Sequence, residues 1–345
     1  YWLPSAYLQG GRPEVIKPDA PWVKVWKTRV VPIALFAVLL VAVAVVYALR
    51  DRLTRLSTRK NKWPVNAFKY TAWVLSIVFV GFGVMAQPSI TQVLTWFHAL
   101  LFQWTWELFL TDPFIFLFWW FILITVFLWG RGLFCGWMCP FGSLSELSYK
   151  IAGKLGLKRF QRKLPQALHD KLKWLKYVVF FGLMATSLYS MSLAEKMAEV
   201  EPFKTAIVLK FIRAWPFVVY AVGLLMAGLF VERFYCRYLC PLGAALAIPA
   251  RLRMFDWLKR YHECGSPCQT CANECPVQAI HPTGEINPNE CVNCLHCQVL
   301  YQSHSKCPVV IRADKRRAAV GKVGDMPRDL APLTNHPNLK GKPNV

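Results

Sequence analysis

The sequence predicts a mainly α-helical, polytopic transmembrane bundle followed by a small cysteine-rich domain. Three observations support this fold class. The 345 residues are 55% hydrophobic and 14% aromatic, and the mean hydropathy is +0.31, values typical of membrane proteins rather than of soluble domains. One short cysteine motif occurs twice among the apolar stretches. Eight of the twelve cysteines gather in the last third of the chain.

Five apolar stretches have about the 20 residues that a helix needs to cross a bilayer. They cover residues 30–49, 67–86, 113–134, 175–193 and 215–234. A sixth stretch, residues 90–110, contains three tryptophans together with His98 and Glu107. Aromatic residues gather where a membrane meets water. This sixth stretch is therefore predicted to be an interfacial helix and not a span.

Loop charges predict the orientation in the membrane. Residues 50–62, 150–176 and 251–260 are rich in Lys and Arg, whereas no Lys or Arg lies between Ala86 and Asp112. Basic loops stay in the cytoplasm. Residues 1–29 are therefore predicted to be a periplasmic lead-in, residues 30–250 a transmembrane domain, and the cysteine-rich end cytoplasmic. A reducing cytoplasm also suits cysteines that bind metal rather than form disulfides.

The formal net charge of +22 is the main argument for nucleic acid as a partner. The basic residues, however, cluster in short loops beside apolar stretches, where they set topology and meet anionic lipid. The sequence contains no module that reads bases. The predicted partner of this charge is the lipid bilayer, and nucleic acid is not predicted.

The repeated motif is Cys-x-x-x-Cys-Pro-x-Gly, found in residues 130–144 and again in residues 231–245. Pro140 and Pro241 suit the first position of a helix, so the preceding cysteines are predicted N-caps with thiolate character. Repeated membrane units often meet around a shared site. The four thiols could hold a metal or a cluster, cycle as dithiols, or be inert buried side chains. They are Cys135, Cys139, Cys236 and Cys240.

Charged residues beside the two motifs have a simpler reading. Arg131, Arg233 and Arg237 are interpreted as interfacial anchors, and Asp112 and Glu232 as residues that face lipid headgroups. Long basic side chains commonly play this part at the ends of membrane helices.

The eight C-terminal cysteines form two runs, each closed by Cys-Pro, as in bacterial 2[4Fe–4S] ferredoxin-like domains. The fourth cysteine of each run ligates the other cluster. This rule predicts one cluster on Cys264, Cys268, Cys271 and Cys307, and a second on Cys275, Cys291, Cys294 and Cys297.

Two features qualify this assignment. The first run has one residue more than usual between its first two cysteines. A zinc ribbon is the main alternative for such cysteines, but it does not require paired Cys-Pro ends. Ligation by His262, His281, His296 or His304 is not predicted. The domain is predicted to cover residues 251–311, and residues 312–345 a basic, loosely packed extension.

Two membrane Cys-x-x-x-Cys-Pro motifs followed by a two-cluster domain resemble the NosR/NapH-type membrane ferredoxins. Within that group, residues 22–308 are most similar to the C-terminal membrane and ferredoxin part of the NosR type. The resemblance implies a bacterial inner-membrane electron-transfer protein, without a substrate of its own, that serves maturation, expression or activity of periplasmic nitrous oxide reductase.

The resemblance also implies cofactors and partners. FMN is expected on a periplasmic domain upstream of this chain. Nitrous oxide reductase or its maturation factors, and a cytoplasmic electron donor or quinol, are expected partners. Two alternatives remain open: a NapH-like quinol dehydrogenase that feeds a periplasmic reductase, and a redox-sensing regulator without catalysis.

The orientation can be tested with reporter fusions. Alkaline phosphatase is expected to be active when fused near Pro18 or after Ala86, because both positions are predicted to be periplasmic. A fluorescent reporter that folds only in the cytoplasm is expected to fluoresce after Val345. Phosphatase activity at Val345 would contradict the predicted topology.

Overall fold

The computed structural model describes residues 21–57, 63–102, 106–255, 258–261, 264 and 268–320. Most of the periplasmic lead-in, His262, and the extension beyond residue 320 lie outside this range. The described part is mainly helical, and two isolated β-bridges join Cys264 to Cys268 and Ile280 to Ile286. The mainly helical fold class is therefore confirmed.

The helices of the predicted membrane region occupy most of the chain. Their bounds are α1 Pro21–Thr28, α2 Val30–Ala48, α3 Arg50–Leu56, α4 Trp63–Leu75, η2 Ser76–Gly83, α5 Ile90–Leu101, α6 Trp106–Leu110, α7 Pro113–Trp129, η3 Phe134–Met138, α8 Pro140–Lys154, η4 Leu157–Arg159, α9 Gln166–Leu172, α10 Leu175–Tyr189, α11 Met191–Met197, η5 Ala198–Val200, η6 Lys204–Val208, α12 Trp215–Phe230, α13 Phe234–Tyr238, α14 Pro241–Ala247 and η7 Pro249–Leu252. The cysteine-rich domain adds α15 Thr270–Glu274, α16 His296–Tyr301 and α17 Pro308–Val320.

Each of the five predicted spans contains a helix, but two helices meet the usual length and apolarity for crossing a membrane. These are Val30–Ala48 and Pro64–Gly83, the second running through α4 and η2. The helices at the other three positions have 17, 15 and 16 residues. Five complete spans therefore remain a prediction.

Local chemistry explains where the shorter helices end. Asp112 begins α7 by accepting the backbone N–H of Phe114 at 3.0 Å, and Gly130 ends it with φ of +86°. A residue with a side chain rarely adopts a positive φ, so glycine suits this position. Ser89 caps α5 in a capping box with Gln92. At 12 residues, α5 is too short to span, in line with the predicted interfacial role.

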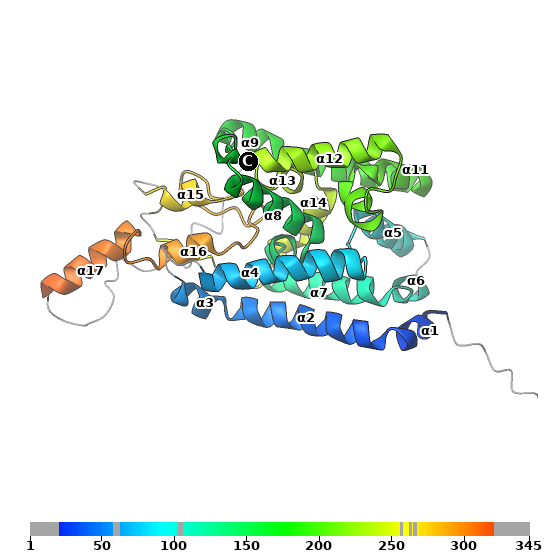
Figure 1. Ribbon diagram of the computed structural model, residues 1–345, viewed down its shortest axis with the longest axis horizontal. Helices are drawn as coiled ribbons and strands as arrows, with labels where there is room; N and C mark the ends of the chain where they lie inside the picture. The colour runs from blue at the N-terminus through cyan, green and yellow to red at the C-terminus, as the bar shows by residue number, and fades with distance from the viewer. Residues whose placement is uncertain are drawn as a thin grey trace, which may run out of the picture.

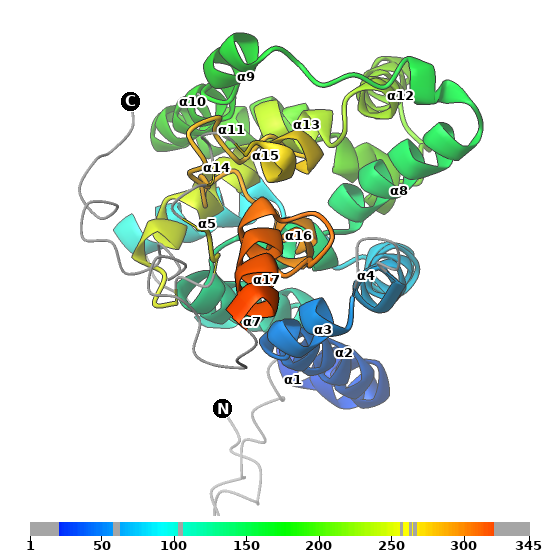
Figure 2. The same cartoon turned by 90° about the vertical axis from the view of Figure 1, so that its left-hand side faces the viewer.

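The axes of helices α2, α4, α7 and α12 are nearly parallel, with α2 and α4 running in opposite directions, and the cysteine-rich helices α15, α16 and α17 lie together at one end (Figure 1). The second view looks onto that end (Figure 2). Aromatic rings join α2 to the first motif: Phe36 packs on Phe118 with centroids 5.5 Å apart, and Tyr47 on Trp137 at 5.9 Å. The outward side of α2 exposes apolar residues such as Val31 and Val38, as a lipid-facing helix does.

Residue 312, the predicted start of the basic extension, lies in a helical part of the chain. It falls inside α17, which begins directly after Cys307 with Pro308. Proline is favoured at the first position of a helix. The following residues, including Ala313 and Lys315, propagate a helix well. The backbone is therefore helical through residue 320, and the boundary between the domain and the extension stays a prediction.

A buried ion cluster ties the two motif copies to α4. The Glu146 carboxylate on α8 accepts hydrogen bonds from Arg233 at 2.5 Å and Lys69 at 3.1 Å, and Lys150 lies 3.5 Å away. Burial by itself raises the pKa of Glu146, but the charges of Arg233 and Lys69 outweigh it and lower the pKa. A buried carboxylate with two buried cations must stay ionised to balance them.

We expect Glu146→Ala to destabilise the protein by about 3–5 kcal/mol, because Arg233 and Lys69 would lose their buried counter-ion. The measurement is the thermal unfolding midpoint of the detergent-solubilised protein. Asp170→Ala removes the half-exposed Lys173 pair and should change stability by about 1 kcal/mol or less. Because the folded pKa of Glu146 is lowered, its contribution should be lost as pH falls below about 4.3. Equal effects of the two variants would contradict this account.

Candidate functional site

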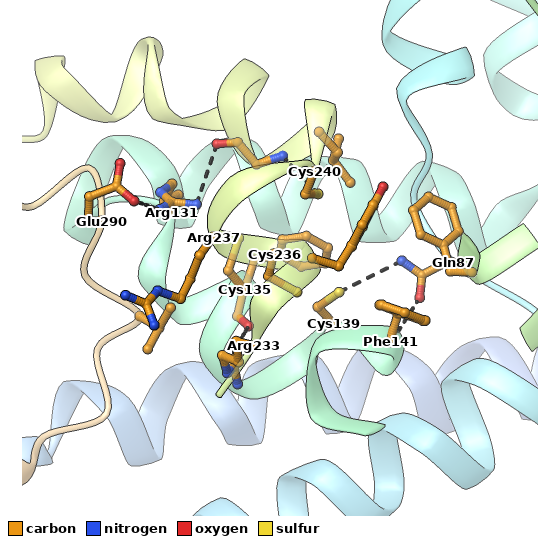
Figure 3. Close-up of a pocket in the computed structure, with 16 residues that line it drawn as sticks. Gln87, Arg131, Cys135, Cys139, Phe141, Arg233, Cys236, Arg237, Cys240 and Glu290 are labelled. Atoms are coloured by element: carbon orange, nitrogen blue, oxygen red, sulfur yellow. Dashed lines mark hydrogen bonds and ion pairs between the residues drawn. The ribbon is translucent and has the colours of Figure 1, made fainter. Parts of the chain in front are cut away.

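The four motif cysteines line one cavity, which we call the thiol cavity. Cys135 and Cys139 come from the first copy, and Cys236 and Cys240 from the second. The space between atoms amounts to about 580 Å³, including its open mouth. The side chains converge from two helical segments that lie far apart in the sequence (Figure 3). Cys135 and Cys236, the first cysteines of the two copies, are 101 positions apart. The structure therefore brings together the four thiols that sequence analysis grouped.

Both copies build the same turn around their second cysteine. Cys139 is the N-cap of α8 and Cys240 the N-cap of α14, with Pro140 and Pro241 at the following position. The Gly243 N–H donates to the Cys240 Sγ at 3.3 Å. The predicted cap positions are confirmed. Each second thiol is thereby held at a turn that faces the cavity.

Two arginines cross between the copies. A Cβ on Gly142 would lie 3.3 Å from the Arg233 guanidinium, and a Cβ on Gly243 would lie 3.3 Å from the Arg131 guanidinium. Arg131 also donates to the Gly243 carbonyl at 3.4 Å, and Arg233 donates to the Cys135 carbonyl. Each copy therefore places an arginine over the glycine turn of the other, and this reciprocity is the structural basis of the shared cavity.

The reading of these arginines as interfacial anchors is wrong. Arg131, Arg233 and Arg237 are 3%, 1% and 4% exposed, and all three line the thiol cavity, where Glu290 is the one acidic residue among the described lining residues. Guanidinium groups are buried only when something compensates their charge. The excess of positive charge makes the cavity suitable for an anion.

An iron–sulfur cluster fits this donor set. Four thiolates around a cationic iron–sulfur core form a net anion, and Cys is the usual ligand for such clusters. Among the described residues, no three His, Cys, Asp or Glu side chains converge closely enough for a single metal ion. The four thiols line one cavity between the two motif copies. Cys135, Cys139, Cys236 and Cys240 are the residues that would hold the group, and a bound cluster would supply one-electron chemistry.

Burial opposes the expected thiolate character of the second cysteines, Cys139 and Cys240. Burial raises the pKa of the Cys139 thiol to about 11 and that of Cys240 well above its ordinary value. Hydrogen bonds from Gly142 and Gln87 to the Cys139 sulfur, and from Gly243 to the Cys240 sulfur, oppose this shift but do not outweigh the loss of water. A thiolate here would have to be stabilised by a bound metal, which displaces the proton.

Sequence analysis missed two polar groups of the cavity. Gln87, after the second predicted span, donates to the Cys139 Sγ at 3.8 Å and accepts the Phe141 N–H at 3.4 Å. The Tyr235 hydroxyl is buried and has no hydrogen-bond partner in the described chain. No spacing signal identifies Gln87. The position of Tyr235, directly before Cys236, was a usable signal.

The first predicted cluster group also lines a single cavity. Cys264, Cys268, Cys271 and Cys307 surround it together with Arg260 and two tyrosines. Tyr261 and Tyr301 stack face to face, with centroids 4.2 Å apart. Cys307 therefore lies beside the three earlier thiols of its group, although ten positions separate it from Cys297 in the sequence.

The second predicted group forms an apolar cluster of its own. Cys275 and Cys294 are buried within it, and Cys291 and Cys297 pack against it. His281 and His304 are engaged elsewhere, with Thr283 and Asp314. Their use as cluster ligands is thus not indicated. Ligation by the eight cysteines remains a prediction that this arrangement supports.

Comparison with known proteins supports the repeat. A family model described as a 4Fe-4S binding domain matches residues 111–158 and again residues 213–260. Each match contains one copy of the motif, so the internal repeat is confirmed. A second family model, NosR, matches residues 262–318, which hold the C-terminal cysteines. No solved structure matches the chain.

Two helical segments match a 4Fe-4S binding domain, and two apolar helices of the described chain are long enough to cross a bilayer. These features define a membrane iron–sulfur protein of the electron-transport class. The chain is 48% identical over 295 residues to the regulatory protein NosR of Stutzerimonas stutzeri, covering 86% of this chain and 40% of that protein. It is 46% identical over 319 residues to the protein NirI of Paracoccus denitrificans, covering 92% and 45%.

A shorter NosR sequence from Pseudomonas aeruginosa is 63% identical over 82 residues, which are 24% of this chain and 82% of that sequence. The chain belongs to the NosR/NirI family. It spans less than half the length of the longer relatives.

We expect Cys294→Ser to remove one cluster of the cysteine-rich domain and about four irons. It should also weaken folding of the domain, because ligation free energy is folding free energy in small metallodomains. Iron and acid-labile sulfide analysis of the purified protein measures the first effect, and limited proteolysis the second. A wild-type protein with zinc and no sulfide would contradict the cluster assignment.

Proposed function

We propose that this chain is the membrane and iron–sulfur part of an electron-transfer protein that serves maturation, expression or activity of periplasmic nitrous oxide reductase. Membership of the NosR/NirI family supports the biological role. One observation carries the biochemical role: four partly buried thiols and three buried arginines share one cavity, beside a domain with two further groups of four cysteines.

The proposed cofactors follow from these three groups. Two [4Fe–4S] clusters occupy the eight C-terminal cysteines, and a third iron–sulfur centre occupies the thiol cavity. The buried arginines support an anionic centre there over inert thiols, since uncompensated buried cations are unfavourable. FMN belongs to a periplasmic flavin domain in this proposal, and that domain is a partner within the same protein.

The proposed topology has five spans, a periplasmic N-terminus and a cytoplasmic cysteine-rich domain in the bacterial inner membrane. Exposed apolar residues on α10 and α12, including Val178, Phe181 and Val219, support lipid contact by the shorter helices. A bilayer core about 30 Å thick is too wide for one efficient electron hop. A centre between the cysteine-rich domain and the periplasmic side would serve as an intermediate step. Electrons come from a cytoplasmic donor or from quinol.

A second candidate is a redox-sensing regulator. The NosR relatives of Stutzerimonas stutzeri and Pseudomonas aeruginosa are called regulatory proteins, which favours this candidate. Such a protein would need its clusters but no electron flow to nitrous oxide reductase. The two candidates predict different results. If the chain transfers electrons, a defective variant should lose nitrous oxide reductase activity while the reductase is still expressed. If the chain is a regulator, the variant should lose expression of the reductase.

We expect the double variant Cys139→Ala, Cys240→Ala to contain about eight irons instead of about twelve, and to remain in the membrane. Nitrous oxide reductase should then be produced but inactive in vivo, because the intermediate centre is missing. The matched control is Cys268→Ala, which should remove irons from the cysteine-rich domain and leave the thiol-cavity centre.

Normal nitrous oxide reduction by the double variant would mean that the thiols are structural. Loss of reductase expression rather than of activity would favour the regulator.

A further inference from the structure

The segment 289–295, which carries Cys291 and Cys294, lies directly against the first motif copy. The Trp137 indole donates to the Asn293 carbonyl at 3.1 Å, and Arg131 donates to the Asn289 carbonyl at 2.5 Å. Asn293 and Leu295 have φ of 50° and 64°, a backbone conformation that residues other than glycine seldom adopt. The segment is therefore held in a defined shape by contacts with the membrane region.

Two glycines make this approach possible. A Cβ on Gly136 would overlap the Val292 carbonyl oxygen, and a Cβ on Gly132 would lie 2.5 Å from the Asn293 side chain. At these distances even alanine would force the two segments apart. The first copy therefore meets the 289–295 segment at a separation that only glycine allows.

The second copy lacks both glycines. When the copies are aligned on their cysteines, Arg233 stands at the position of Gly132, and Arg237 at that of Gly136. Arg237 reaches the cysteine-rich domain through its side chain, which donates to the Gln278 amide oxygen at 2.6 Å. The repeat is thus symmetric around the thiols and asymmetric where the domain docks.

A buried ion pair holds the same segment. The Lys176 ammonium on α10 donates to both oxygens of Glu290, at 2.6 and 2.8 Å, and Arg131 lies 3.9 Å from that carboxylate. Lys176 is fully buried and Glu290 is 5% exposed. Glu290 directly precedes Cys291, so this pair fixes the position of a predicted ligand.

The two cysteine groups differ in their relation to the thiol cavity. Glu290 and Val292, on either side of Cys291, line the thiol cavity (Figure 3 labels Glu290). The cavity of Cys264, Cys268, Cys271 and Cys307 shares no lining residue with it in the described chain.

We infer that Gly132 and Gly136 are positioning residues that seat the 289–295 segment against the thiol cavity, so that the second cysteine group is its neighbour and the first group is the outer one. This inference rests on the proposed function for the third centre. It names the electron partner of the thiol cavity. When both sites are loaded, the chemistry between them is the exchange of one electron, without bond formation or proton transfer.

The order can be tested by EPR on the reduced holoprotein, since nearby paramagnetic centres broaden one another's signals. Cys294→Ser should lose about four irons and abolish the broadening of the thiol-cavity signal. Cys268→Ser should lose the same number and leave that broadening in place. The reverse pattern would overturn the inferred order.

The seating can be tested without any loaded centre. Gly136→Ala should increase the rate of tryptic cleavage in the cysteine-rich domain by about tenfold, because the added Cβ opposes docking. Gly182→Ala is the matched control, since no atom lies within 4 Å of a Cβ there. Equal cleavage of the two variants would overturn the seating role.

The two experiments separate the inference from the proposed function. A wild-type protein with only two iron–sulfur signals would overturn the third centre and with it the inferred electron partner. The cleavage rates would still decide whether the glycines seat the domain. A third signal that Cys294→Ser leaves broadened would retain the proposed function and overturn the order.

Discussion

The reciprocal crossing of Arg131 and Arg233 is the interaction on which the centre of the molecule depends. Each guanidinium belongs to one motif copy and packs over the glycine turn of the other. Because both are buried, their charges must be balanced, and Glu146 and Glu290 supply part of that balance. Lys69 and Lys176 share the same two carboxylates, which leaves the surroundings of the four thiols positive. An anionic centre would complete this arrangement.

Duplication explains the four thiols, and divergence of the copies explains the rest. A repeat contributes two Cys-Pro turns that face a common volume, as in other membrane proteins built from repeats. The two copies then differ at two equivalent positions, which hold glycine in the first copy and arginine in the second, and this difference gives the copies different roles. Glycine at 132 and 136 admits the backbone of the cysteine-rich domain, whereas arginine at 233 and 237 fills the same space with charge. One copy serves as the docking face and the other supplies cations.

Membership of the NosR/NirI family is consistent with this physical picture. An electron-transfer protein has little bond chemistry to perform, so its structure must mainly hold redox groups close together and keep water away from them. In the proposed role, the two buried ion clusters of the described chain would hold its cysteine groups in place. The burial that raises the pKa of the Cys139 thiol disfavours a free thiolate at this site. A bound metal would stabilise the thiolate form.

Local patterns in the sequence determined the helical fold class, the helix at each predicted span, the repeat, and the Cys139 and Cys240 caps, because hydropathy and Cys-Pro turns act over a few residues. The grouping of Cys264 with Cys307 also followed from spacing. Tertiary structure alone decided that Arg131, Arg233 and Arg237 are buried, that Gln87 reaches Cys139, and that Gly136 meets Val292. Such contacts join residues far apart in the chain, from 41 positions for the Arg237–Gln278 bond to 158 positions for the Arg131–Asn289 bond. Their energies depend on burial and on partners that no local pattern specifies.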